Sequence, residues 1–342
     1  MTGKIRVIVV DDSVVVRRVI SDVLSEDPEL EVVGTASNGK LALAKLDQTP
    51  ADLVTLDLEM PELDGLATLA AIRKRSPRLP VIMFSSATRR GAEATIDALS
   101  HGANEYVTKP EGTGALATTR ERIKSDLIPK IKALCTRPIT MPIPRIRPGA
   151  ETAPATAVAI GVSTGGPPAL HALVAALPVL PVPIFIVQHM PPLFTAMLAQ
   201  RLAGAGKLPV VEASAGTRIE AGHVYLAPGD HHLVVDRGAL RTTHDPPECS
   251  CRPSVDVLFR SVAAAYGAGA LGVVMTGMGS DGMRGAEAIR EHGGTVLVQD
   301  QASSVVWGMP GAVVRAGAAS AVVSLDALAG EIARRVRGPG SA

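Results

Sequence analysis

A serine, a histidine and an aspartate in the second half of this sequence have the types and positions needed for nucleophilic catalysis. Ser163 lies in Gly161-Val162-Ser163-Thr164-Gly165, which satisfies the pattern G-x-S-x-G between an apolar run and a segment that begins with prolines. Glycines permit a sharp turn, and the N-terminus of the following helix supplies N–H donors for an oxyanion. The pattern therefore indicates acyl transfer. A glycine-rich phosphate cradle and a plain tight turn are alternatives that the pattern alone leaves open.

A nucleophilic serine needs a base and an acid that orients the base. Among the eight histidines, His189 directly follows the apolar run 184–188, so we expect it at the same sheet edge as Ser163. Asp281 and Asp300 compete for the role of the acid, because each comes after an apolar run. The spacing favours Asp281, whose alternative role is to cap the helix that follows it.

A second group of chemically active residues lies near the N-terminus. Asp11 and Asp12 follow the first apolar run, and Asp57 ends another. Because the carboxyl ends of parallel strands meet in one crevice, we expect these carboxylates to converge. Two anions about 4 Å apart repel by about 4 kcal/mol at an effective dielectric near 20, so a cation must neutralise them. The all-oxygen donors suit Mg²⁺, and Lys109 and Ser85 also follow apolar runs. The alternative is that each acid caps a helix.

The order of apolar runs and helical patterns indicates an α/β fold in two domains. Residues 4–124 alternate β-branched runs with helices, which predicts a five-stranded parallel, flavodoxin-like sheet. The alternation resumes near residue 157, which predicts a doubly wound, mostly parallel domain, and residues 231–243 have the pattern of a β-hairpin attached to its sheet. A proline-rich stretch between the two favours an extended linker. The predicted boundaries are 1–130 for the first domain, 131–156 for the linker and 157–340 for the second domain.

Composition excludes several classes of protein. The chain has 34 basic and 33 acidic side chains, so no long-range field attracts nucleic acid or an anionic membrane. With one Trp, three Tyr and four Phe it has few rings on which bases could stack. Prolines interrupt the apolar segment 153–188, which rules out membrane insertion there. An odd number of cysteines, Cys135, Cys249 and Cys251, predicts reduced thiols and a cytoplasmic location.

The N-terminal motifs resemble the receiver domain of two-component response regulators. They are VVDDS, TLDLEMPELDGL, MFSSA and YVTKP. The resemblance implies that a histidine kinase is the phosphodonor for Asp57, and that phosphorylation biases a two-state surface. It also implies further roles: Asp11 and Asp12 bind Mg²⁺ together with Asp57, Lys109 contacts the phosphoryl group, and Ser85 and Tyr106 occupy the positions of the switch pair.

The C-terminal motifs resemble the catalytic domain of chemotaxis protein-glutamate methylesterases. They are IGVSTGGPPAL, IVQHMPP, YLAPGDHHL, RPSVDVLF and MTGMGSDGMRG. The resemblance implies a cofactor-free hydrolase with a triad of Ser163, His189 and Asp281. It suggests Thr164 and Met278 as oxyanion or substrate contacts. It further implies that the substrates are glutamate γ-methyl esters of chemoreceptors, with receptor glutamines deamidated as a side activity.

A competing hypothesis makes the second domain a nucleotide-binding or partner-binding module switched by the first. The glycines around Ser163 would then cradle a phosphate, and no particular histidine or aspartate would be needed nearby. The sequence departs from the resemblance in its proline-rich linker and in Cys249 and Cys251, which precede RPSVDVLF. These departures concern the docking of the domains rather than the chemistry.

Overall fold

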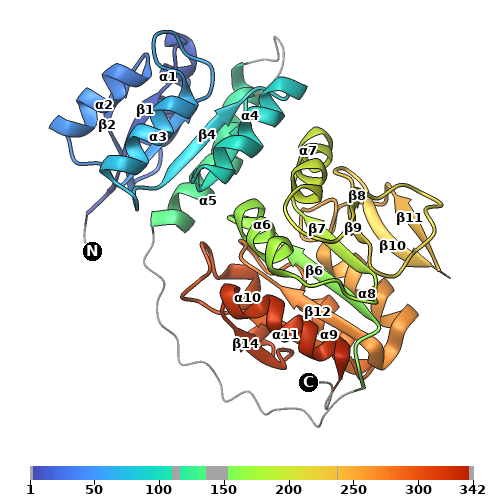
Figure 1. Cartoon of the computed structure of the whole chain (residues 1–342). Helices are drawn as coiled ribbons and strands as arrows, with labels where there is room; N and C mark the ends of the chain where they lie inside the picture. The colour runs from blue at the N-terminus through green and yellow to red at the C-terminus, as the bar shows by residue number, and fades with distance from the viewer. Residues whose placement is uncertain (1–2, 110–115, 136–152, 237, 339–342) are drawn as a thin grey trace. The chain divides into compact units, whose positions relative to one another are not determined.

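The chain forms two compact units in the computed structural model, which describes residues 3–109, 116–135, 153–236 and 238–338 (Figure 1). The last helix of the first unit, α5 (Leu116–Cys135), includes the first five residues of the predicted linker, 131–135. Ile131 is fully buried in the core of this unit, and this burial explains why the helix continues past residue 130. Residues 136–152 of the predicted linker lie outside the described residues.

The first unit is built on a five-stranded sheet in which every strand pair is parallel, which confirms the predicted fold. Two inner strands, Leu53–Asp57 and Val81–Ser85, are buried along their whole length, as expected where helices cover both faces of a sheet. Its other elements are β1 (Ile5–Val10), α1 (Val14–Ser25), β2 (Leu30–Ala36), α2 (Gly39–Gln48), β3 (Leu53–Asp57), α3 (Gly65–Arg75), β4 (Val81–Ser85), α4 (Arg89–Ser100) and β5 (Glu105–Thr108).

The strand order in this sheet brings the N-terminal acids together. The order is β2-β1-β3-β4-β5, so β1 and β3 are neighbours. Asp11 directly follows β1 and Asp57 is the last residue of β3, so both lie at the carboxyl edge of the sheet.

The second unit contains a seven-stranded sheet whose strand pairs are all parallel, and this confirms the predicted parallel α/β architecture. Its elements are β6 (Ala157–Val162), α6 (Gly166–Ala176), β7 (Ile184–Gln188), α7 (Pro192–Ala203), β8 (Val210–Glu212), β9 (Val224–Leu226), β10 (His232–Asp236), β11 (Ala239–Thr243), α8 (Val255–Tyr266), a 3₁₀ turn η1 (Gly267–Gly269), β12 (Ala270–Val274), α9 (Met283–Glu291), β13 (Thr295–Gln299), α10 (Gly308–Arg315), β14 (Ala321–Val323) and α11 (Leu325–Arg337).

The order of these strands identifies a position for a site. The large sheet runs β14-β13-β12-β6-β7-β9-β8. The chain therefore leaves β6 on one side, toward β7, and later returns to the other side of β6 with β12. Ligand sites in open α/β sheets lie beyond the carboxyl ends of the strands at such a reversal. The segments that follow β6, β7 and β12 are the expected lining of a site.

The predicted hairpin is present, but its attachment is not the one expected. β10 and β11 pair with each other in a separate two-stranded antiparallel sheet, and within the described residues neither strand pairs with the large sheet. The hairpin instead packs against α8, and Leu233, Val235 and Leu240 belong to the same buried cluster as the apolar face of that helix. Because α8 removes the apolar face of the hairpin from water, the hairpin need not pair with the large sheet to bury that face.

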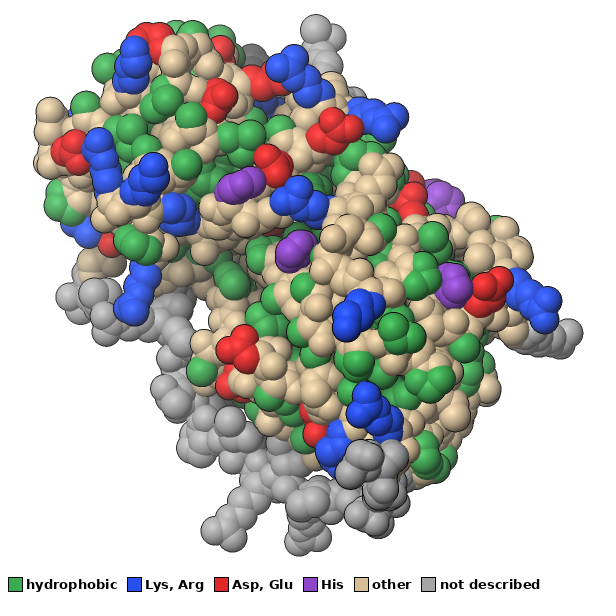
Figure 2. Space-filling view, viewed as in Figure 1, with side chains coloured by type: hydrophobic (Ala, Val, Ile, Leu, Met, Phe, Trp, Pro, Cys, Tyr) green, Lys and Arg blue, Asp and Glu red, His purple; other side chains and the backbone are tan. Residues whose placement is uncertain are grey.

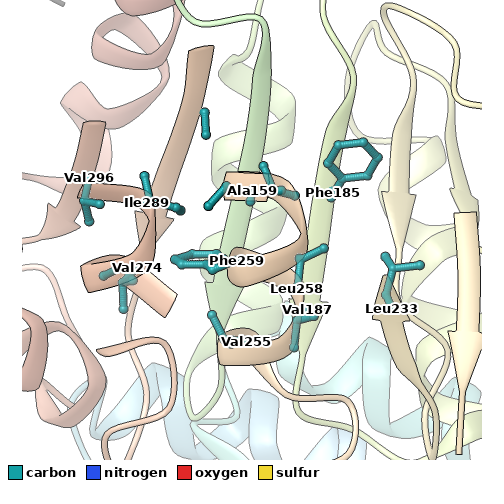
Figure 3. Packing of buried hydrophobic residues seen from close by; sticks show 14 of the residues in the cluster. Ala159, Phe185, Val187, Leu233, Val255, Leu258, Phe259, Val274, Ile289 and Val296 are labelled. Atoms are coloured by element: carbon teal, nitrogen blue, oxygen red, sulfur yellow. The ribbon is translucent and has the colours of Figure 1, made fainter. Parts of the chain in front are cut away.

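Helix α8 is held against the large sheet by a buried core. Figure 3 shows Phe259 of α8 in one buried cluster with Val274 and Ile289, and both of these residues are fully buried. The start of the helix also packs closely against β6, since a Cβ on Gly161 would lie 2.2 Å from a methyl carbon of Val255. Glycine is needed at position 161, and this close packing places the N-terminus of α8 at the carboxyl edge of the sheet.

The surface agrees with the nearly balanced charge. On the face shown in Figure 2, basic and acidic side chains are interspersed on both units. None of the described helices is long and apolar enough to cross a membrane.

Candidate catalytic and phosphoryl-acceptor sites

The three candidate triad residues lie at one edge of the large sheet. Ser163 directly follows β6 and His189 directly follows β7, the two strands being neighbours. Asp281 lies in the loop between β12, on the other side of β6, and α9. The backbone N–H of Ser163 donates to the carbonyl of Thr276 at 2.9 Å, which ties the serine turn to that loop.

Glycines shape the turn that carries Ser163. Gly165 has a φ of +73°, and a Cβ there would lie 2.6 Å from Val305. A Cβ on Gly277 would lie 2.8 Å from the Cβ of Ser163 and 2.3 Å from the sulfur of Met309. Both positions therefore require glycine, one for its backbone conformation and the other for close approach.

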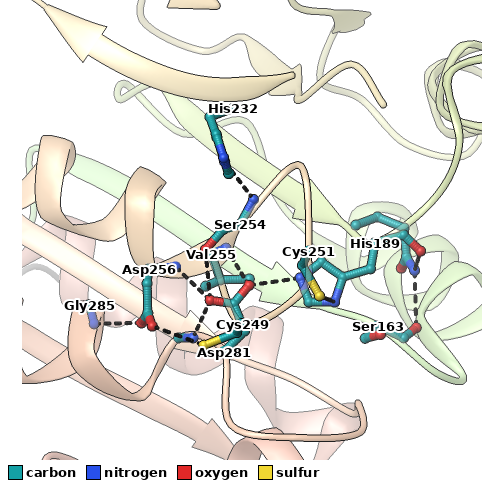
Figure 4. Close-up of polar contacts among 12 residues, drawn as sticks. Ser163, His189, His232, Cys249, Cys251, Ser254, Val255, Asp256, Asp281 and Gly285 are labelled. Atoms are coloured by element: carbon teal, nitrogen blue, oxygen red, sulfur yellow. Dashed lines mark hydrogen bonds and ion pairs between the residues drawn. The ribbon is translucent and has the colours of Figure 1, made fainter. Parts of the chain in front are cut away.

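The predicted acid is bound to the predicted base. Asp281 Oδ2 lies 2.8 Å from Nε2 of His189, and their side chains are 2 % and 13 % exposed (Figure 4). Asp281 also accepts hydrogen bonds from Ser254 Oγ at 2.8 Å and from the backbone N–H groups of Val255 at 2.7 Å and Asp256 at 3.0 Å. These donors lie at the start of α8, where the helix dipole favours an anion. Burial alone raises the pKa of Asp281, but the hydrogen bonds with His189 and these amides lower it overall.

The two nitrogens of His189 have different partners. Because the Asp281 carboxylate can only accept, Nε2 carries the proton and Nδ1 is left as the basic nitrogen. Nδ1 faces the thiol of Cys251, whose sulfur lies 3.5 Å away. Burial lowers the pKa of His189, but the hydrogen bonds with Asp281 and Cys251 outweigh it and raise the pKa to about 10.

The hydroxyl of Ser163 is close to this pair in the fold but not bonded to it. Within the described parts of the chain, Ser163 Oγ makes no hydrogen bond, so the expected contact between hydroxyl and imidazole is missing. The serine carbonyl instead accepts from the side-chain amide of Gln188 at 3.1 Å (Figure 4). In this state the thiol of Cys251 takes the nitrogen that the hydroxyl would need. Catalytic hydrogen bonds are often formed only in the substrate complex, so the arrangement remains compatible with a triad.

Other candidate residues have different surroundings. Asp300, the rival acid, accepts hydrogen bonds from Ser303. Asp281 does cap a helix, but the helix is α8; the cap of α9 is Gly282. Thr164 is 4 % exposed, and its carbonyl accepts from the hydroxyl of Thr276 at 2.9 Å. Met278 is partly exposed in the loop before Asp281.

Two residues that support the site escaped the sequence analysis. Ser254 is fully buried and donates to Asp281 through its hydroxyl, while its backbone N–H donates to Nδ1 of His232 at 3.1 Å. His232 is 1 % exposed on β10. A serine before an apolar helix is a recognisable N-cap pattern, but here its hydroxyl bonds to Asp281 and not to its own helix. Nothing in the sequence points to His232.

The acids of the first unit converge as expected. Asp11 and Asp57 are 0 % and 2 % exposed, and Nζ of Lys109 lies 2.9 Å from an oxygen of the first and 2.7 Å from an oxygen of the second. Oxygens of these two residues and of exposed Asp12 all lie within 4.8 Å of one another. Burial raises the pKa of Asp57 to about 6, against the effect of Lys109 and with a further contribution from Asp11. Three clustered carboxylates are a donor set that fits Mg²⁺.

Ser85 and Tyr106 lie on neighbouring strands near this cluster, but both have other contacts. The hydroxyl of Ser85 donates to the carbonyls of Gly91 at 2.9 Å and Ser86 at 3.1 Å. The buried ring of Tyr106 has Nζ of Lys130 5.4 Å from its centroid. In this state the Ser85 hydroxyl is directed to the start of α4 and not to Asp57.

Two family models match this chain. Residues 158–332 match the model described as CheB methylesterase, and residues 7–120 match the response regulator receiver domain. The first match covers the large sheet of the second unit, and the other covers the five-stranded sheet of the first.

Similar proteins match nearly the whole chain. A protein-glutamate methylesterase/protein-glutamine glutaminase of Trichodesmium erythraeum (strain IMS101) is 51 % identical over 349 residues, which cover 97 % of this chain and 99 % of that protein. A protein of the same name from Nocardioides sp. (strain ATCC BAA-499 / JS614) is 52 % identical, with 97 % and 95 % covered. The crystal structure of the Thermotoga maritima CheB methylesterase catalytic domain matches with 38 % identity and a TM-score of 0.51, covering 52 % of this chain and 97 % of that one.

Proposed function

Because this chain belongs to the CheB methylesterase family, we propose that its second unit hydrolyses glutamate γ-methyl esters of chemoreceptors and deamidates receptor glutamines. The triad is Ser163, His189 and Asp281. The observation that supports this assignment most is the buried hydrogen bond between His189 and Asp281 at the edge of the sheet that carries Ser163. The cytoplasmic location stays a prediction.

Each triad residue has a defined task. Asp281 keeps the proton of His189 on Nε2, so Nδ1 takes the proton of the Ser163 hydroxyl as its oxygen attacks the ester carbonyl. The imidazolium then returns this proton to the leaving methanol, or to ammonia when the substrate is glutamine. Water hydrolyses the acyl-enzyme by the same route. For the first step, the thiol of Cys251 must move away from Nδ1.

Developing negative charge on the substrate oxygen needs donors near Ser163. The N-terminus of α6 begins three residues after the serine and provides a favourable dipole. It supplies fewer N–H donors than expected from the sequence, because the prolines at 167 and 168 carry no N–H and the N–H of Gly166 donates to the carbonyl of Ser163 at 2.8 Å. Thr164 in the turn and Met278 in the facing loop are the residues that we assign to oxyanion or substrate contacts.

The first unit regulates this activity. Asp57 accepts a phosphoryl group from a histidine kinase. Asp11, Asp12 and Asp57 would hold Mg²⁺, which would offset the added negative charge. Lys109, already paired with Asp57, contacts the phosphoryl oxygens.

Phosphorylation then acts through the switch residues. For its hydroxyl to reach the new acceptor oxygens, Ser85 must leave the carbonyl of Gly91 at the start of α4. The exchange links the charge on Asp57 to the position of α4, and Tyr106 is the partner that we assign to Ser85 in this switch.

The test of the catalytic proposal is release of methanol from a methylated chemoreceptor fragment, together with labelling by a fluorophosphonate. Ser163→Ala is expected to lower kcat by at least about a thousandfold and to abolish labelling, because the nucleophile is lost. Ser214→Ala, at an exposed serine of the same unit, is the matched control and is expected to keep both. Near-normal methanol release by Ser163→Ala would exclude the proposed mechanism.

A further inference from the structure

The thiol of Cys251 lies next to the catalytic histidine, so that Cys251, His189 and Asp281 form a group of thiol, imidazole and carboxylate that shares two residues with the triad. Its sulfur lies 3.5 Å from Nδ1 of His189, and Nε2 of the same ring lies 2.8 Å from Asp281 (Figure 4). A thiol next to an imidazole that a carboxylate orients is the arrangement that activates nucleophilic cysteines. Cys251 is partly exposed, so a small reagent can reach it.

We propose that Cys251 is a peroxide-reactive thiol whose oxidation reversibly blocks the esterase at His189. The site takes hydrogen peroxide and other small hydroperoxides. This inference rests on the proposed function only for its effect on activity, since the reactivity of the thiol can be measured without any ester substrate.

The reaction balances with the groups present and the peroxide. Nδ1 of His189 accepts the thiol proton, and the sulfur of Cys251 attacks one peroxide oxygen. The S–O bond forms as the O–O bond breaks, and the leaving hydroxide takes the proton from the imidazolium to become water. Sulfur is oxidised by two electrons and the peroxide is reduced. The product is a sulfenic acid, which added thiols reduce again.

Oxidation blocks catalysis because of where the new oxygen lies. The sulfur already occupies the side of Nδ1 that the Ser163 hydroxyl needs. An unmodified thiol can rotate away at the cost of one weak hydrogen bond. A sulfenic acid is larger than a thiol, and its O–H is a stronger hydrogen-bond donor to the imidazole than an S–H, so it keeps Ser163 away from its base.

The three cysteines differ in a way that makes the proposal selective. The sulfur of Cys249 lies 3.8 Å from an oxygen of Asp256, and burial together with the nearby carboxylates raises its pKa. Burial raises the pKa of Cys135 to about 12. Only the thiolate reacts readily. Of these thiols, Cys251 alone has an imidazole nitrogen as its neighbour in the described residues; Cys249 faces a carboxylate and Cys135 a backbone carbonyl.

The test uses the full-length chain treated with hydrogen peroxide, with sulfenic acid trapped by dimedone and located by mass spectrometry. We expect Cys251 to react at least about tenfold faster than Cys249 and Cys135. His189→Gln should slow the reaction of Cys251 by a similar factor, because the base is lost. Methanol release should fall in step with the modification of Cys251 and return after treatment with dithiothreitol.

Matched cysteine variants separate this effect from general oxidation. Each variant is compared with its own untreated sample: Cys249→Ser should lose activity in peroxide like the unsubstituted chain, whereas Cys251→Ala should lose it at least about tenfold more slowly. Modification of Cys251 at the rate of Cys135, or equal peroxide sensitivity of Cys251→Ala, would overturn the proposal. If the untreated chain released no methanol, the proposed function would fail, and the trapping rates would still decide whether Cys251 is the reactive thiol.

Discussion

The hydroxyl of Ser254 donates a hydrogen bond of 2.8 Å to Oδ1 of Asp281, inside the protein and at the first turn of α8. The other carboxylate oxygen bonds to His189. Because Oδ1 accepts from Ser254 and also from the backbone N–H groups of Asp256 and Gly282, the carboxylate cannot rotate freely, and this fixes the orientation of the imidazole. We regard Ser254 as a positioning residue, which acts on the reaction through Asp281 and His189.

Ser254→Ala should lower kcat by about tenfold with little change in KM, because a buried carboxylate oxygen loses a donor worth about 1–3 kcal/mol. Loss of this donor raises the pKa of Asp281. The less firmly oriented carboxylate also makes a weaker hydrogen bond to His189, which lowers the pKa of His189, so the pH at which activity rises should shift downward. Full pH profiles of kcat and KM check this. Ser254→Thr, which keeps the hydroxyl, should restore the original profile; an unchanged profile in the alanine variant would show a merely structural role.

The pKa of His189, raised to about 10, predicts an alkaline rise in activity. A general base works only when it is neutral, and a raised pKa keeps the imidazole protonated to higher pH. kcat/KM of the free enzyme should therefore increase with pH from 7 toward 10. The ring signals of His189 in an NMR titration should show the same midpoint, and Asp281→Asn should move that midpoint to lower pH. A midpoint near the ordinary histidine value in the unsubstituted chain would contradict the prediction.

Gly277→Ala should impair catalysis without a change at any polar group. The new methyl group would lie 2.8 Å from Cβ of Ser163 and 2.3 Å from the sulfur of Met309, so the serine turn must shift. Overpacking of this kind costs about 1–3 kcal/mol, and we expect kcat/KM to fall at least about tenfold. Gly330→Ala is the control, because its methyl group would meet nothing within 4 Å on α11. Equal activities of the two variants would show that Ser163 tolerates the displacement.

Phosphorylation of Asp57 should weaken at acidic pH, because burial raises the pKa of its carboxyl, to about 6 without bound metal, and only the ionised carboxylate is a nucleophile. Bound Mg²⁺ lowers this pKa, so the midpoint with the metal present should lie below that value. Incorporation of phosphate from acetyl phosphate, followed by mass spectrometry with Mg²⁺ present, measures this. Lys109→Ala removes the cation that lowers this pKa, so the midpoint should move to higher pH. Removal of Mg²⁺ with a chelator should abolish incorporation at every pH, and incorporation that persists would rule out the proposed metal site.

The sequence by itself determined which segments form the strands and which polar residues stand at their ends. Runs such as 157–162 and 184–188 are short, apolar and bounded by turn residues, which predicts buried parallel strands, so Ser163 and His189 were expected at the carboxyl edge of the sheet. The same reasoning placed Asp11 and Asp57 together. It predicted a hairpin at 231–243 from alternation and turn residues, but it could not say what would cover its apolar face.

Only the tertiary structure decided which of these neighbours touch. Spacing along the chain favoured Asp281 over Asp300 without deciding between them, whereas the fold gives His189 to Asp281, 92 residues away. It also brings Ser254 under that carboxylate and Cys251 onto the other nitrogen of the ring, 62 residues from it. Such contacts depend on how α8 packs on the sheet and on side-chain orientation. The pattern of a strand shows which of its side chains are buried and which residue stands at its end. A hydrogen bond between distant segments depends on how all the helices and strands pack together.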